Sequence, residues 1–190
     1  LHHTRLVGTI IPGNGEKDGL DLNIDANHID IAFLNKFTKN VFSNLQGQAS
    51  GWTRVFGPFK EVNLEGNMLV NEMKMRLIAL GTDYHLAGDS VIMRPDNILI
   101  QNARIYDNSG IPGVNEHSAV LNAHLMHDAL PDLSFDSNVD AHNLHCYNFP
   151  QGDGMNFYGT VFADAQVNLH GETGAVNIEV DVTPTRRTTL

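Results

Sequence analysis

An all-β fold is the class that the sequence predicts, and three observations carry this prediction. Apolar and polar residues alternate with a period of two in several segments, which is the spacing expected of strands that bury one face. Turn signals rich in Gly, Asn, Asp and Pro separate these segments, among them PGNG, DNSG, PQGDG and HGETG. Only one segment, 32–46, has apolar residues at helical spacing, so we expect a single short helix.

The first predicted strand covers residues 20–31. Leu20, Leu22, Ile24 and Ala26 form its apolar side, and Asp and Asn residues alternate with them. Successive side chains of a strand point to opposite faces, so this segment has one face for an apolar interior and one for water.

The predicted helix follows at 32–46. An apolar stripe with a spacing of four residues runs through it: Phe33, Phe37, Val41 and Leu45. Gly47 comes directly after the stripe, and glycine is a common residue just beyond the end of a helix. We expect this helix to close one end of the β structure or to pack across its open side.

Further alternating segments follow the helix. Those with a period of two are 62–70, 73–79, 120–128, 135–144 and 176–182. Segments 47–57 and 159–171 both begin with glycine and are predicted as strands as well. Many such strands in succession indicate an all-β domain.

The segment 20–31 recurs later in the chain as 135–144. The matching residues, at a constant spacing, are Asp21, Asn23, Asp25 and Ala26 with Asp136, Asn138, Asp140 and Ala141. An irregular insert and then a glycine-opened strand follow each copy. We therefore expect a leader or linker at 1–19 and one domain at 20–190, built of two related modules at about 20–131 and 132–190. Coincidence among β-rich segments is the alternative.

The composition limits the classes of function. The chain of 190 residues is 42% hydrophobic, enough for a packed interior, yet no apolar run reaches the roughly 18 residues of a membrane-spanning helix. The net charge of −10 opposes binding to nucleic acid and to anionic membrane surfaces. The single cysteine, Cys146, excludes an internal disulfide. Since the chain does not begin with Met, we expect it to be a segment of a longer protein.

No motif in the sequence predicts an enzyme. GQASG lacks the spacing of a nucleophile elbow, and GNGEKDG lacks that of a dinucleotide-binding loop. The pairs His124/His127 and His142/His145 are three residues apart, so on a regular strand their side chains point to opposite faces and do not share a metal ion. The carboxylates alternate along strands like residues of a solvated face. We therefore expect no catalytic residues, no metal and no cofactor.

Several stretches together resemble one protein family. They are LQGQASGWTRVFGPFKEVNLEGNMLV, LGTDYHL, DNILIQNARIYDNSGIPG, LSFDSNVDAHNL and FYGTVFADAQVNLHGETGAVNIEVDVTPTRRT. From about Leu20 to its end, the chain resembles the C-terminal half of TamB-type proteins, the translocation and assembly module proteins of the AsmA-like superfamily in Gram-negative envelopes. The resemblance implies a curled, half-open β sheet, a β groove or β roll, with an apolar inner surface. It also implies a periplasmic location, an inner-membrane anchor upstream, a role in phospholipid transport or outer-membrane protein assembly, and a BamA-like barrel as partner.

The apolar faces of the predicted strands are then the lining of a lipid groove. The expected lining residues are Leu20, Leu22, Ile24, Val62, Leu64, Met68, Val70, Met73, Met75, Leu77, Leu121, Leu125, Phe135, Val139, Val161, Val167, Leu169, Ile178, Val180 and Val182. Burial of one acyl methylene contributes about 0.8 kcal/mol, so such a groove holds phospholipid acyl chains without polar contacts. In the alternative, these faces pack together as the core of a closed sandwich.

A different class of function is a surface or periplasmic β module that binds a glycan or a protein partner. Solvent-facing Trp52, Tyr84 and Tyr106 are its expected contacts. In either class, the edges of an open sheet carry unpaired backbone groups. We expect neighbouring modules to cover these edges in the parent chain, and the edges of this segment to form dimers or oligomers that are not physiological.

Overall fold

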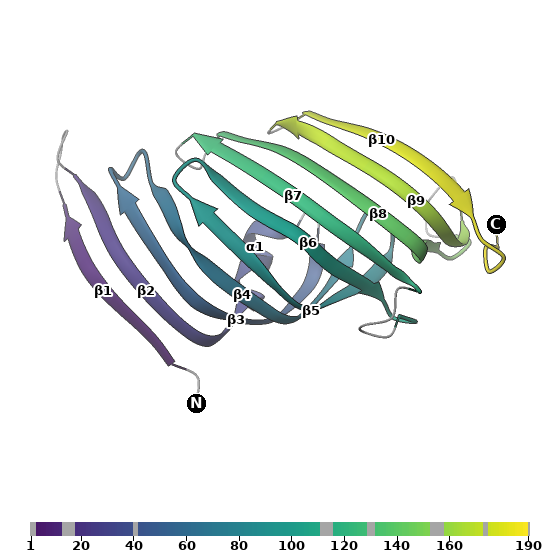
Figure 1. Ribbon diagram of the computed structural model, residues 1–190, viewed down its shortest axis with the longest axis horizontal. Coiled ribbons are helices and arrows are strands. Elements are labelled where there is room, and N and C mark those ends of the chain that lie inside the picture. Colours follow the sequence, from purple (N-terminus) through teal and green to yellow (C-terminus); the bar gives the residue numbers. More distant parts are fainter. Residues whose placement is uncertain are drawn as a thin grey trace.

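The computed structural model describes residues 3–12, 18–39, 42–110, 116–128, 132–152, 158–172 and 175–189. These residues form one antiparallel sheet of ten strands, in which each strand pairs with the strands before and after it in the sequence (Figure 1). The strands are β1 (His3–Ile11), β2 (Gly19–Asp30), β3 (Phe42–Gly57), β4 (Asn63–Leu77), β5 (Thr82–Arg94), β6 (Asn97–Asp107), β7 (Ser118–Asp128), β8 (Asp132–Phe149), β9 (Gly159–Glu172) and β10 (Ala175–Pro184). The all-β prediction is confirmed.

The sheet is a single open layer. β1 and β10 lie at its opposite edges, and the sheet is neither closed into a barrel nor strongly curled (Figure 1). All ten strands of the described chain belong to this one sheet, so the closed sandwich of two packed sheets is wrong. One face of the sheet carries the cluster of buried apolar residues, and we call it the inner face.

The helix expected at 32–46 is much shorter. A 3₁₀ turn, η1 (Ile31–Leu34), continues into one turn of helix, α1 (Asn35–Thr38), and β3 already begins at Phe42. The side chain of Asn35 accepts a 2.9 Å hydrogen bond from the backbone N–H of Leu45 and donates one of 2.8 Å to its carbonyl oxygen. These two hydrogen bonds hold the short helix against the start of β3.

A β-bulge surrounds Leu45, the last residue of the predicted helical stripe, which lies in β3. The pairing of β3 with β4 shifts register between Ser43 and Gln46, and Asn44 has a φ of 57°. A bulge adds one residue to a strand, so Phe42 and Leu45, three apart, both contribute to the inner cluster. A helix-like spacing of three residues therefore arises here within a strand.

The first strand lies inside the expected leader at 1–19. His3–Ile11 form β1, which pairs with β2 along its full length, from His3 opposite Asn27 to Ile11 opposite Gly19. Apolar residues lie on both faces of β1, and the whole strand is exposed. This part of the leader is thus a strand of the sheet.

Five strands carry a residue with a left-handed backbone: His28 in β2 (φ 56°), Asn44 in β3 (57°), Glu72 in β4 (49°), Asn102 in β6 (54°) and Asn143 in β8 (46°). Register shifts accompany all of them. Three of these shifts lie between Ala26 and Ile29, Ile100 and Ala103, and Ala141 and Leu144. In each case the two apolar residues that flank the bulge lie three apart and face the same side. These bulges interrupt the alternation without moving apolar residues to the outer face.

The same hydrogen bond supports these three bulges. The backbone N–H of the left-handed residue donates to a polar side chain on the next strand: His28 to Ser50 Oγ (2.9 Å), Asn102 to Asn122 Oδ1 (2.8 Å) and Asn143 to Asp164 Oδ1 (2.8 Å). His28 and Asn143 stand at the same place after the repeated Ala26 and Ala141. The repeated sequence therefore includes a repeated bulge.

Candidate functional site

The strand register places the expected lining residues together. Directly opposite residues of an antiparallel pair point to the same side, so inner-face positions connect from strand to strand. Leu22, for example, lies opposite Val55, which lies opposite Leu64. Across the other half of the sheet, Leu121 lies opposite Val139, and Val139 opposite Val167. Nineteen of the twenty residues lie in strands on this face, and Val62 directly precedes β4.

The twenty residues divide by how deeply they are buried. Met75 belongs to the buried cluster, and Met68, Val70, Met73, Leu77, Leu121, Val139 and Val167 pack against it. The half-buried residues beyond these are Leu20, Leu22, Ile24, Val62, Leu64, Leu125, Phe135, Val161 and Leu169. The edge-strand residues Ile178 (61% exposed), Val180 (54%) and Val182 (44%) face solvent. One part of the inner face is thus packed with side chains, and another part is accessible to solvent.

Tyr84 fills the inner face at one end of the strands. Its side chain extends from β5, is 7% exposed, and its hydroxyl donates a 2.8 Å hydrogen bond to the carbonyl oxygen of His145 in β8. Burial raises the pKa of Tyr84 above its usual value, so the hydroxyl remains a donor at any physiological pH. Because β6 and β7 lie between β5 and β8, this contact crosses the inner face.

Two further contacts join strands at the same end. Asp107, fully buried at the end of β6, accepts a 2.7 Å hydrogen bond from the backbone N–H of His145. The backbone N–H of Asn148 donates to the carbonyl oxygen of Leu80, in the turn between β4 and β5. The neighbouring Gly81 has a φ of 66°, and a Cβ there would clash with the carbonyl oxygen of Asn148. Among the described residues, this end of the inner face is a packed core.

The opposite end of the inner face is apolar and accessible. Leu20, Leu22 and Leu64 lie there at the ends of β2 and β4, half-buried, and Ile178 lies there on the edge strand. No acid–base pair or nucleophile lies among these four side chains. Such a surface is suited to apolar groups, which it can hold by burial alone.

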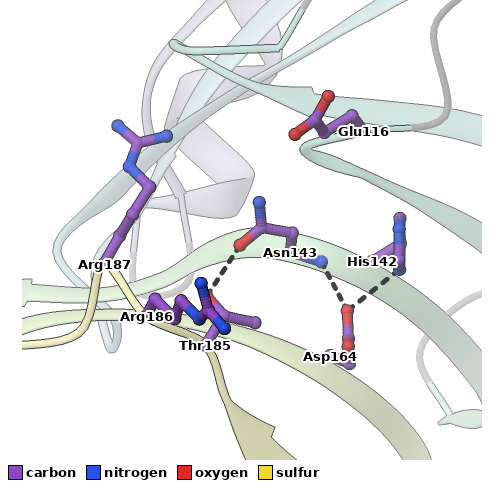
Figure 2. A pocket seen from close by; sticks show the side chains of 7 residues that line it. All are labelled: Glu116, His142, Asn143, Asp164, Thr185, Arg186 and Arg187. Carbon is purple, nitrogen blue, oxygen red and sulfur yellow. Dashed lines mark hydrogen bonds and ion pairs between the residues drawn. The ribbon is translucent and has the colours of Figure 1, made fainter.

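A polar pocket of about 420 Å³ lies on the outer face (Figure 2). Its lining residues are Glu116, His142, Asn143, Asp164, Thr185, Arg186 and Arg187. Asp164 accepts the bond from the Asn143 backbone N–H and lies 2.9 Å from Nδ1 of His142, and Thr185 Oγ1 donates to Asn143 Oδ1 at 2.7 Å. The pocket therefore forms around the bulge of β8, where the C-terminal segment crosses it, and it mixes positive and negative groups.

An aromatic cluster holds this C-terminal segment on the outer face. The rings of His145 and Phe162 stack at 4.6 Å, and the guanidinium of Arg187 lies 4.2 Å from the Phe162 ring centre. Burial lowers the pKa of His145, with the charge of Arg187 acting in the same direction. The spacing of His142 and His145 predicted opposite faces, and this is wrong because the bulge at Asn143 lies between them.

Two of the three aromatic residues expected on the surface are buried. Tyr84 is 7% exposed and Tyr106 only 2%, the latter with its ring 5.4 Å from that of His85. Tyr106 lies opposite Ser118, and Gly110 approaches it so closely that a Cβ on this glycine would lie 3.1 Å from the Cβ of Tyr106. Trp52 alone of the three faces solvent, 46% exposed on the outer face. The expectation of a Trp52–Tyr84–Tyr106 surface is therefore wrong.

No group of three or more His, Cys, Asp or Glu side chains in the described ranges is arranged to hold a metal ion. Burial raises the pKa of the Cys146 thiol to about 11, so it is protonated at neutral pH and is a poor nucleophile. Nor is any helix of the described chain long and apolar enough to cross a membrane.

The fold defines the class as an all-β protein built on a single open antiparallel meander. No family model, no curated protein and no solved structure matches the chain.

Proposed function

We propose that this chain is a non-enzymatic segment of a TamB-type envelope protein whose inner face is an apolar groove for phospholipid acyl chains. In this proposal the chain lies in the periplasm, downstream of an inner-membrane anchor in the parent protein. It acts in phospholipid transport between the inner and outer membranes, in outer-membrane protein assembly, or in both, with a BamA-like barrel as partner. A groove needs a sheet that is more curled than the open sheet described above, and this additional curl is part of the proposal.

The observation that supports the proposal is the accessible apolar end of the inner face. Monomeric soluble proteins rarely leave a large contiguous apolar surface exposed, so such a surface indicates something that covers it. Leu22 and Leu64 lie half-buried there, and Ile178 is mostly exposed. An acyl chain gains about 0.8 kcal/mol for each methylene that it buries, without any directional contact. A lipid held in this way slides along the strands, as transport requires.

A pair of substitutions on one strand tests the groove. Leu64→Glu places a carboxylate on the inner face, and Leu69→Glu places the same group on the outer face of β4, where Leu69 is 44% exposed. Binding of a fluorescent fatty acid to the purified chain is measured for both variants and the parent chain, with circular dichroism as the folding control. We expect Leu64→Glu to abolish binding and Leu69→Glu to leave it unchanged, because a charge opposes acyl-chain burial only where the acyl chain lies.

Native mass spectrometry gives an independent readout. Phospholipid that co-purifies with the parent chain after mild purification supports the groove. A lipid-free chain that takes up no fluorescent fatty acid contradicts it, and so does equal loss of binding in both variants.

The exposed Trp52 favours one second candidate, a β module that binds a glycan or protein partner through its outer face. Trp52 extends from β3, directly opposite Asn67 of β4. Aromatic rings with an adjacent amide are common contacts in such surfaces. Two results together would favour this candidate over the groove. The parent chain takes up no fatty acid, and Trp52→Ala loses binding to the glycan or protein partner.

A further inference from the structure

The two edge strands, β1 and β10, have complementary apolar inner faces. On β1, Leu6 and Ile10 are each 58% exposed, and on β10, Ile178 and Val180 are 61% and 54% exposed. Unpaired edges of this kind are templates for pairing with another strand. Within the described ranges no further strand pairs with either edge, so both can make the same kind of contact.

The strand count decides how two copies fit. Ten strands alternate strictly in direction, so β10 runs antiparallel to β1. A second copy placed beside the first in the same orientation brings its β1 antiparallel to β10 and keeps both inner faces on one side. The pairing then repeats the geometry that every neighbouring pair in the sheet already has.

One register matches the two strands completely. Inner-face residues of both strands have even numbers, because Leu6 lies opposite Ile24 and Val180 opposite Val167. The inner faces of the two copies stay on the same side only if even-numbered residues lie opposite even-numbered ones. Under this condition, all nine residues of β1 have a partner in β10 only when His3 lies opposite Thr183 and Ile11 opposite Ala175. A shift by two residues in either direction leaves part of β1 unpaired.

The charged side chains of the two strands also favour this register. The register places Arg5 directly opposite Asp181 on the outer face, with Glu179 as the diagonal neighbour of Arg5. Opposite charges across a strand pair are favourable, and like charges are unfavourable. Pairing of β10 with a second β10 instead brings the acidic residues of two identical strands together.

We propose that β1 of one copy pairs antiparallel with β10 of a second copy, with Leu6 opposite Val180 and Arg5 opposite Asp181. This contact joins different surfaces, so each added copy presents a free edge again and the association does not stop at two. The inference is independent of lipid binding, since it uses only the strand edges.

Sedimentation velocity of the 190-residue chain across a wide range of concentrations tests the association. We expect a series of species that grows beyond the dimer as concentration rises. Arg5→Glu and Asp181→Arg should each remove the larger species, and the double variant should recover them, while circular dichroism stays unchanged. A chain that remains monomeric at all concentrations overturns the proposal, and so does a series that ends at the dimer.

Cysteine cross-linking tests the register. In a Cys146→Ser background, Leu6→Cys and Val180→Cys are made as separate chains and mixed under mild oxidation. We expect a mixed disulfide between the two chains, and a much lower yield when Val182→Cys replaces Val180→Cys. Cross-linking of Val180→Cys with itself, or equal yields for the two positions of β10, overturns the assigned pairing.

Discussion

The backbone N–H of Asn143 donates a 2.8 Å hydrogen bond to Oδ1 of Asp164 on the neighbouring strand. Asn143 occupies a left-handed conformation in a bulge, where its N–H points away from the regular ladder of backbone bonds. The carboxylate of Asp164 takes the place of the missing carbonyl acceptor. Equivalent bonds at His28 and Asn102 make side-chain support of bulges a recurrent device of this sheet.

Removal of the Asp164 carboxylate should destabilise the β8–β9 pair. Asp164→Ala leaves the half-buried N–H of Asn143 without its acceptor and removes the contact with His142, so we expect a loss of about 1–2 kcal/mol in the free energy of unfolding. Urea unfolding followed by circular dichroism measures it. Gln166→Ala, at an exposed position on the same face of β9, is the matched control. Equal losses in the two variants contradict the assigned role.

The left-handed residue Asn102 should tolerate glycine and reject a branched side chain. Its φ is 54°, and this conformation costs most L-residues about 1–2 kcal/mol relative to the right-handed one. We expect Asn102→Val to lower stability by roughly that amount and Asn102→Gly to change it little, since both keep the backbone N–H that Asn122 accepts. Thermal unfolding of the two variants compares them directly. Similar melting temperatures for valine and glycine would contradict the role of the bulge.

The hydroxyl of Tyr84 should contribute measurably to the packed end of the inner face. Tyr84→Phe keeps the ring and deletes the 2.8 Å bond to the carbonyl oxygen of His145, so we expect a loss of about 1 kcal/mol. Tyr158→Phe, on a ring that is 47% exposed, serves as control and should be near neutral. Both are measured by denaturant unfolding at neutral pH. A neutral Tyr84→Phe would mean that the contact between β5 and β8 adds no stability.

Asp89 should make the protein less stable as pH rises. It lies opposite Val70 on the inner side of β5, and burial raises the pKa of its carboxyl, with Arg104 acting in the opposite direction. Between the unfolded pKa of about 3.9 and the higher folded pKa, the folded state binds more protons than the unfolded state. The stability contributed by the protonated carboxyl is therefore lost as pH rises through the folded pKa.

The test compares Asp89→Asn with the parent chain at several pH values. The amide keeps an oxygen for hydrogen bonding and carries no charge, so we expect the variant to be the more stable at pH 7, with an advantage that shrinks toward pH 4. Asp136→Asn, at an exposed outer-face position, should show no such trend. An advantage that grows on acidification would reverse the assigned direction of the pKa shift.

Alternation by itself predicted most of the inner face. The assignments of Leu20, Leu22 and Ile24 to one face agree with the register, because a period of two is a property of the strand alone. The same rule missed β1, since an exposed edge strand buries neither face and carries apolar residues on both. It also misread Leu45, since a bulge spaces inner-face residues as a helix does.

The sequence by itself determined that the chain is all-β and which side chains share a face, because both follow from contacts and dihedral preferences within a few residues. Only the tertiary structure decided that the sheet is a single open layer, which end of its inner face is packed, and that Tyr84 and Tyr106 are buried. These properties depend on which strands lie side by side and on where bulges shift them. They rest on contacts between residues far apart in the sequence, such as the hydrogen bond from Tyr84 to His145, which no local sequence pattern predicts.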